Sequence, residues 1–291
     1  MFWKSGEAVT EAGFDRPTIP SVGGSGIHHP KIASIFDDCF PPRYEPRLGT
    51  SLIELCLPLA CDCSKYVFDK ILRCLSLTSV NSSGPECLLI DCCGQFSVLK
   101  FAQFLKTEVC SSSSREGMTT SASFLEEVLS KLHIIRVFTN RELTMALYAS
   151  RDVLRRNSVS SIFIYSVASL SDLQRHCCDC WKAVGLEQTL WMGMLSRLVF
   201  DFNLLCVCIR HGTSFSSNKL QSRDTDENEH LTSPQKTPPE IHRFMDSMSF
   251  GWTNGISHRI EIFSCSLNFI SYFKQGGQFK VLLDKRNKAE V

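Results

Sequence analysis

Residues 51–75 read SLIELCLPLACDCSKYVFDKILRCL, and this stretch decides the fold. Its first part, Ser51 to Leu57, is a short and nearly continuous apolar run, which is typical of a strand buried on both faces. From Ser64 onward the apolar residues recur at helical spacing, which predicts a helix that reaches Leu75. The order strand, short loop and helix is the one that commonly holds a nucleotide phosphate.

The loop from Pro58 to Ser64 lacks the residues that bind phosphate. A phosphate loop needs glycines that let backbone N–H groups turn inward, a lysine for the β and γ phosphates, and a hydroxyl for magnesium. Only the hydroxyl remains, at Ser64. Lys65 follows Ser64 instead of preceding it, and one residue on a helix turns a side chain by roughly 100°. Taken alone, the segment reads as an ordinary buried strand followed by a helix.

Length and composition narrow the class of protein. The chain has 291 residues, enough for one large α/β domain with disordered ends or for two small domains. Its net charge of +1 predicts no general attraction to nucleic acid or to an anionic membrane, so a DNA contact must come from a local patch. Met1 to Glu7 has no apolar signal core, and no apolar run is long enough to span a bilayer. The fifteen cysteines therefore fit a reducing, intracellular compartment.

The cysteine clusters raise the alternative of a metal site. The densest are His176 to Cys180 and the pair Cys61 and Cys63. Neither is interpreted as the paired knuckle that holds a structural zinc ion, and Cys206 and Cys208 are expected to be small buried hydrophobic side chains. We expect no metal, and a zinc-binding interaction module stays open as an alternative.

The rest of the chain alternates short apolar strands with amphipathic helices. Capping boxes at Ser123-x-x-Glu126 and Thr139-x-x-Glu142 predict the starts of two helices, and a Ser-rich surface loop is expected over 110–121. Further strands are predicted over 86–91, 133–138, 161–165 and 204–209, and further helices around 98–105, 124–132, 143–154 and 190–202. This pattern predicts a three-layer α/β fold with a mainly parallel sheet covered on both faces.

The ends of the chain and one internal stretch differ in composition from this core. Residues 1–30 mix Gly, Pro, Ser and His and predict a disordered arm, and residues 212–240 are almost free of apolar side chains and predict a disordered insertion. Three short antiparallel strands are expected around 258–263, 267–273 and 279–283, the last two joined by Gly276-Gly277. The predicted plan is therefore an arm, one domain over 31–285 with an insertion, and a tail over 286–291.

Four stretches in this order are similar to the ATPase domain of RecA-type recombinases and their paralogs. They are Leu52 to Leu55 with Pro58, Leu89-Ile90-Asp91, Arg197-Leu198-Val199 with Asp201 and Leu204, and Trp252 followed after five residues by His258-Arg259. The resemblance runs from about residue 30 to 285 and implies a RecA-like P-loop NTPase fold with a C-terminal antiparallel extension. It assigns Trp252, His258 and Arg259 to fixing that extension or to an interface. Taken singly, Trp252 also fits a core gap and Arg259 an ordinary strand-edge charge.

The resemblance also implies that the chemistry of the nucleotide site is gone. Cys63 takes the position of the phosphate-binding lysine, and Tyr165 takes that of the strand-end aspartate that orients magnesium. Other replaced positions are the glycines, the catalytic glutamate and the sensor glutamine, where Ala60 with Cys61 or Asp62, Cys93 and His211 stand. Phosphoryl transfer depends on those charges, so no meaningful ATP hydrolysis is expected. No catalytic residue or cofactor is expected, and ATP would be held by a partner subunit.

The function implied by the resemblance is that of a non-catalytic mediator in homologous-recombination repair of DNA double-strand breaks, in the nucleus. RecA-type subunits stack head to tail with nucleotide between neighbours, so a subunit without its own site can cap an assembly or complete a partner's site. The expected partners are other recombinase paralogs in a hetero-oligomer, with single-stranded or branched DNA bound through the complex and no membrane. An active DNA-dependent P-loop ATPase remains an alternative.

Overall fold

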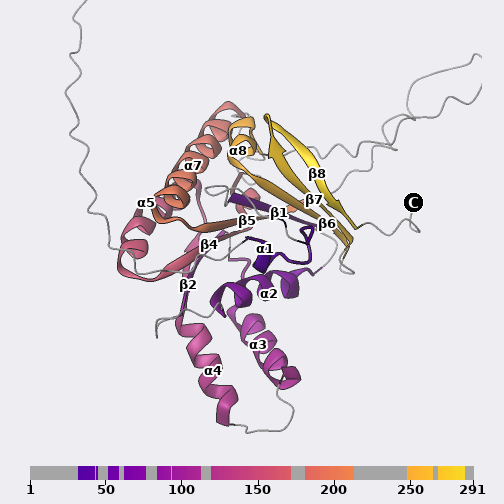
Figure 1. Ribbon diagram of the computed structural model, residues 1–291. Coiled ribbons are helices and arrows are strands. Elements are labelled where there is room, and N and C mark those ends of the chain that lie inside the picture. The colour runs from indigo at the N-terminus through magenta and orange to yellow at the C-terminus, as the bar shows by residue number, and fades with distance from the viewer. Residues whose placement is uncertain are drawn as a thin grey trace, which may run out of the picture.

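The protein is described here from a computed structural model. The described residues are 32–42, 44, 52–58, 62–76, 84–92, 94–112, 119–171, 181–212, 248–264 and 268–285. Eight strands form one sheet in the order β3-β2-β4-β5-β1-β6-β7-β8, and helices lie against both of its faces (Figure 1). The prediction of an α/β fold with a mostly parallel sheet and antiparallel C-terminal strands is confirmed.

The strands lie close to the predicted ranges. They are β1 (Leu52–Pro58), β2 (Glu86–Cys92), β3 (Leu132–Val137), β4 (Val159–Tyr165), β5 (Leu205–Gly212), β6 (His258–Ser264), β7 (Asn268–Gln275) and β8 (Gln278–Asp284). The hairpin between β7 and β8 turns at Gly276 and Gly277, whose φ angles are 60° and 82°. Such left-handed backbone is the conformation that glycine adopts without strain, so the predicted turn is confirmed.

The strand β6 has mixed pairing: it is antiparallel to β7, as predicted for the C-terminal strands, but its parallel pairing with β1 was not predicted. The strand β6 is parallel to β1, with Glu54 opposite Arg259, and only β7 and β8 continue the sheet in antiparallel fashion. A parallel neighbour requires a crossover connection, and the helix α8 (Phe250–Gly255) lies in the segment between β5 and β6 that provides it. This short helix was not predicted from the sequence.

The helices divide between the two faces of the sheet. One face carries α1 (Ile32–Ile35), α2 (Ser64–Leu75), α3 (Val98–Ser112) and α4 (Thr119–Ser130), and the other carries α5 (Asn140–Arg156), α7 (Trp181–Phe202) and α8 (Figure 1). Each face has its own apolar core, because successive strand side chains point to opposite sides. In the described part of the chain, no helix has both the length and the apolar character needed to cross a membrane.

The two predicted capping boxes have different outcomes. At α5, the Thr139 hydroxyl accepts a hydrogen bond from the Glu142 N–H at 3.2 Å, and the Glu142 carboxylate accepts one from the Phe138 N–H at 2.7 Å. The helix α4 begins at Thr119, so Ser123 lies inside it and does not cap it. The expected loop over 110–121 is also shorter, because α3 continues to Ser112 and α4 starts at Thr119, four residues before the predicted cap Ser123.

Several predictions lie outside the described residues. These are the arm over 1–30, the insertion beyond Gly212 and the tail over 286–291. Gly212 itself ends β5.

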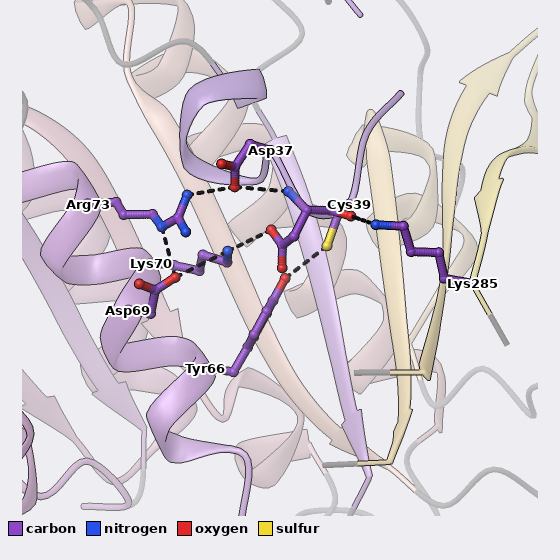
Figure 2. Close-up of polar contacts among 8 residues, drawn as sticks. Asp37, Cys39, Tyr66, Asp69, Lys70, Arg73 and Lys285 are labelled. Carbon is purple, nitrogen blue, oxygen red and sulfur yellow. Dashed lines mark hydrogen bonds and ion pairs between the residues drawn. The ribbon is translucent and has the colours of Figure 1, made fainter. Parts of the chain in front are cut away.

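A charged contact holds residues 32–42, which we call the N-terminal strap, against α2. The Lys70 side chain is only 1% exposed, and its Nζ lies 2.7 Å from Asp38 Oδ1 and 3.3 Å from Asp69 Oδ2 (Figure 2). The same ammonium lies 4.6 Å from the centre of the Tyr66 ring. Beyond the end of β8, Lys285 Nζ donates to the Asp38 carbonyl at 3.0 Å, so the strap joins α2 to the last strand of the sheet.

A second ion pair lies beside Lys70 but nearer to solvent. Arg73 bridges Asp37 at 2.6 Å and Asp69 at 2.9 Å, and all three side chains are at least a third exposed (Figure 2). Exposed pairs contribute little to stability, whereas removal of one partner from a buried pair leaves an uncompensated charge. Asp38 is therefore expected to contribute more to the stability of the fold than its neighbour Asp37.

The two adjacent aspartates give a matched test. Asp38→Ala is expected to lower the free energy of unfolding by about 3 kcal/mol, because the Lys70 ammonium would stay buried with only the more distant Asp69. Asp37→Ala is expected to cost less than about 1 kcal/mol. Urea denaturation of both variants measures the difference, and equal losses would show that the buried pair does not hold the strap.

Candidate functional site

The carboxyl ends of β1, β5 and β4 lie side by side at one edge of the sheet. The strand β5 pairs in parallel with both of its neighbours, so the three ends are adjacent. In open α/β sheets, ligands bind outside the carboxyl ends of the strands. Three of the predicted positions are brought to this edge, namely Ser64 at the start of α2, Tyr165 at the end of β4 and His211 near the end of β5.

A carboxylate already occupies the start of α2. Asp62 Oδ1 accepts a hydrogen bond from the Ser64 N–H at 3.0 Å and another from the Ser64 hydroxyl. Its second oxygen lies 3.5 Å from Lys100 Nζ. The hydrogen bonds with Ser64 are the main reason why the pKa of Asp62 lies below its usual value. The first N–H groups of a helix attract anions, and here the chain supplies that anion itself.

Aromatic side chains fill the neighbouring part of the edge. The Tyr165 ring packs edge-on against Phe96, with centroids 5.7 Å apart, and lies 5.6 Å from the His211 ring. Burial raises the pKa of the Tyr165 hydroxyl, and contact with Ser64 opposes that shift. The end of β4 therefore offers a neutral phenol where a carboxylate would be needed to orient a magnesium ion.

His211 is also neutral near pH 7. Burial lowers its pKa, and its Nδ1 lies 2.9 Å from the Ser166 hydroxyl. Ser166 follows β4 directly and has a φ of 59°, a left-handed conformation that is uncommon outside glycine. The pair joins the ends of β4 and β5.

Asp91 is the one carboxylate at the end of β2. Its Oδ1 accepts a hydrogen bond from the Phe96 N–H at 3.0 Å, and its Oδ2 lies 3.6 Å from Arg136 Nε. Burial raises its pKa. Its contacts hold the turn that leads into α3, so it has a structural role in the described edge.

The remaining predicted positions of the loop are only partly described. Pro58 is the last residue of β1, and Cys63 is buried directly before α2. Ala60, Cys61 and Cys93 lie outside the described residues.

The predicted structural residues Trp252 and Arg259 converge on a buried carboxylate that sequence reasoning missed. Glu54 of β1 is fully buried, and its Oε2 lies 2.7 Å from Arg259 Nε while its Oε1 accepts from Trp252 Nε1 at 3.1 Å. Arg210 Nε lies 3.5 Å from Glu54 Oε1. We call these four residues the Glu54 cluster. The signal was present in the sequence, since a glutamate and an arginine each interrupt an apolar strand.

A second buried carboxylate lies beside this cluster. Glu261 follows Arg259 by two residues on the same side of β6 and accepts a hydrogen bond from the Tyr272 hydroxyl at 3.1 Å. Burial raises the pKa of Glu261 to about 7, and Arg259 works against that shift. Its proton is therefore exchanged close to neutral pH.

His258 holds a chain of hydrogen bonds between the strap side and β1. Its Nε2 lies 2.8 Å from the Tyr44 hydroxyl and its Nδ1 lies 3.0 Å from the Ser257 hydroxyl. The Ser257 hydroxyl donates to the Leu52 carbonyl at 2.6 Å, so it accepts from Nδ1–H, and Nε2 then accepts from Tyr44. Burial lowers the pKa of His258 to about 4, which keeps the ring neutral and able to accept at Nε2.

Eight cysteines of the described residues are buried and form no disulfide, namely Cys39, Cys56, Cys63, Cys74, Cys87, Cys92, Cys206 and Cys208. Burial raises the pKa of Cys56 and of Cys87 to about 12, so these thiols stay protonated and unreactive. Within the described ranges, no group of three or more His, Cys, Asp or Glu side chains is arranged to hold a metal ion. Cys177 and Cys180 are separated by two residues, which is a zinc-ligand spacing, but both lie outside these ranges.

Comparison with known proteins identifies no family for this chain. No family model matches the chain, and no characterised protein matches it at a significant level.

The capping role of Asp62 can be tested with inorganic phosphate. Asp62→Ala is expected to cost about 1 kcal/mol, similar to the loss of a helix cap, and to free the Ser64 N–H at the first position of α2. The variant should then gain thermal stability from added phosphate more strongly than the wild type does. Asp152→Ala, at an exposed position within α5, is the control that should show no such gain. An equal response in all three proteins would contradict the capping role.

The pKa of Glu261 predicts a change of stability with pH. Its folded-state pKa of about 7 lies above the ordinary 4.5, so its contribution to stability is greatest below about pH 4.5 and is lost as the pH rises through 7. Relative to wild type, Glu261→Gln is expected to become more stable by up to about 3 kcal/mol across that range. Denaturation at a series of pH values measures the difference. The contribution of His258 to stability changes with pH in the opposite direction, because its pKa is lowered. His258 is present in both proteins, so its contribution cancels in the comparison.

An exposed glutamate supplies the control for this experiment. Glu126→Gln on α4 changes the same chemical group at the surface and is expected to show no comparable slope. If the difference in free energy of unfolding between Glu261→Gln and wild type also stayed constant with pH, Glu261 would ionise freely in the folded protein.

Proposed function

We propose that this chain is a non-catalytic RecA-type subunit that acts as a mediator in homologous-recombination repair of DNA double-strand breaks. The proposal extends the resemblance to a protein, X-ray repair cross-complementing protein two, a small recombinase paralog. It includes a RecA-like P-loop NTPase fold, a nuclear location and a hetero-oligomer with other recombinase paralogs. DNA, single-stranded or branched, would be bound through that complex.

The observation that carries the proposal is the arrangement of three strand ends. The resemblance assigns the phosphate loop, the magnesium aspartate and the sensor to the ends of β1, β4 and β5, and these three strands are neighbours in the sheet. The order of strands is therefore consistent with a RecA-like ancestry.

The same edge argues against ATP hydrolysis. The negative charge of Asp62 at the start of α2 opposes the approach of a phosphate, and Tyr165 and His211 are neutral where the transferring phosphoryl group needs charge. A subunit of this kind contributes surface and shape to an assembly rather than chemistry. ATP would then be bound by a neighbouring subunit.

The test is binding to purified recombinase paralogs. The full chain is mixed with each paralog in turn, and a stable complex with at least one of them is expected in size-exclusion chromatography. Failure with every paralog would count heavily against the mediator function.

One variant distinguishes the alternative, an active ATPase, from the proposed non-catalytic subunit. Ser64 is the only hydroxyl retained from a phosphate loop, so Ser64→Ala is expected to leave the ATP hydrolysis of a paralog complex unchanged. Isothermal titration of the isolated chain with ATP and magnesium should give no binding. Micromolar binding that is lost in Ser64→Ala would instead support an active site in this chain.

A further inference from the structure

The outer side of α7 is an apolar surface that no described element covers. Leu186, Leu190 and Phe200 are 73%, 52% and 82% exposed, which is unusual for side chains of this size. Between Ala183 and Phe200, about 26 Å of helix, Arg197 is the one charged side chain among the exposed residues, and the exposed Asp201 that follows pairs with Arg151 of α5. We call this surface the α7 face, and it consists of Ala183, Leu186, Thr189, Leu190, Gly193, Arg197 and Phe200.

Neighbouring helices border the α7 face and extend its apolar area. The helix α5 lies along one side, where Trp191 Nε1 donates to the Thr144 hydroxyl at 2.9 Å, and α8 lies along the other (Figure 1). Met145 of α5 and Phe250 of α8 are themselves 62% and 80% exposed. The surface is therefore wider than one helix and is large enough for a second helical layer.

Gly193 lies at the centre of the α7 face. A Cβ atom added at this position would meet no atom of the described residues within 4 Å, so none of their contacts requires glycine here. Glycine inside a helix costs about 1 kcal/mol relative to alanine. The missing side chain does permit another helix to approach closely, because the distance between packed helices depends on the residues at the contact.

The exposed residues are placed symmetrically about Gly193. Leu186 and Phe200 each lie seven residues from it, close to two helical turns. An antiparallel α7 from a second copy, centred on the same glycine, would place Leu186 against Phe200 in two equivalent contacts. The face is therefore complementary to itself, as a two-fold interface requires.

The charges beside this surface agree with the same arrangement. In the antiparallel pair, Arg197 of each copy comes alongside Glu187 of the other, which lies on the border with α5. The two arginines stay on opposite sides of the two-fold axis and do not face each other. Opposite charges thus meet twice at the rim of an otherwise apolar contact.

We propose that two copies of this chain form a homodimer by packing their α7 helices antiparallel across Gly193. The contact is isologous, with the apolar residues of the α7 face at its centre and the Arg197–Glu187 pairs at its rim. This inference does not depend on the proposed recombination function.

Two variants test the dimer by sedimentation equilibrium. Wild-type protein is expected to have twice the mass of one chain, with a concentration-dependent return to monomer. Leu186→Glu is expected to weaken the dimer by at least about tenfold. Leu99→Glu is its matched control, because Leu99 is a leucine of equal exposure, 70%, on α3 at the opposite face of the sheet, and it should leave the mass unchanged.

Gly193→Gln separates association from folding. Glutamine favours a helix more than glycine does, and its side chain has free space in the single chain, so the monomer should be at least as stable as the wild type. The bulk at the two-fold axis should nevertheless abolish the dimer. The combined variant Arg197→Glu with Glu187→Arg should associate better than Arg197→Glu alone.

Three results would overturn the proposed homodimer. A wild-type chain that is monomeric at every accessible concentration overturns the proposal. So does a dimer that survives both Leu186→Glu and Gly193→Gln, since its interface would then lie elsewhere. If these two variants instead abolish binding to a recombinase paralog while the chain alone is monomeric, the face serves that partner and the homodimer is excluded.

Discussion

The salt bridge between Glu54 and Arg259 is the interaction on which the arrangement of the sheet depends. Glu54 lies on β1 and Arg259 on β6, and their side chains meet at 2.7 Å in an interior from which water is excluded. Removing either partner would leave a buried charge, which is strongly destabilising, so neither strand can shift its register alone. Trp252 and Arg210 contact the same carboxylate, which ties α8 and β5 to the pair.

The register between β1 and β6, which this pair fixes, also determines the contacts of His258 and Glu261. With Glu54 opposite Arg259, Ile53 lies opposite His258, and the His258 ring points to the face where the strap packs. Its hydrogen bonds to Tyr44 and Ser257 then become available. On the other face, Glu261 is brought beside the cluster, where burial raises its pKa. A slip of one residue would exchange the two faces and lose all of these contacts together.

Sequence analysis succeeded where the signal is local. The strand β1 and the helix α2 were predicted to within one residue, because an apolar run and a helical period are properties of neighbouring residues. The parallel pairing of β6 with β1 was not predicted, since the pattern of a strand does not show which distant strand it will pair with. The helix α8 was missed because it has six residues, two of them glycine, and is held by the Ser249 cap and by burial of Trp252. The role of Glu54 was missed because its partners Trp252 and Arg259 meet it only in the fold. The contact between Asp62 and Ser64 spans only two residues, so it is a local signal that the sequence analysis did not use.

The stabilising contacts and the carboxyl edge occupy different parts of the sheet. The Glu54 cluster lies under α8, and the strap holds α2 by Lys70 from the outside, away from the loop ends. A change at the edge therefore leaves both in place. Polar groups at this edge still need hydrogen-bond partners, because a buried polar group without a partner destabilises the fold. Asp62 satisfies the start of α2, and the rings of Tyr165 and Phe96 pack together beside it. Under the proposed function, this edge is a nucleotide site that has lost the charged groups needed for chemistry, while the Glu54 cluster and the Lys70–Asp38 pair stabilise the surrounding fold elsewhere.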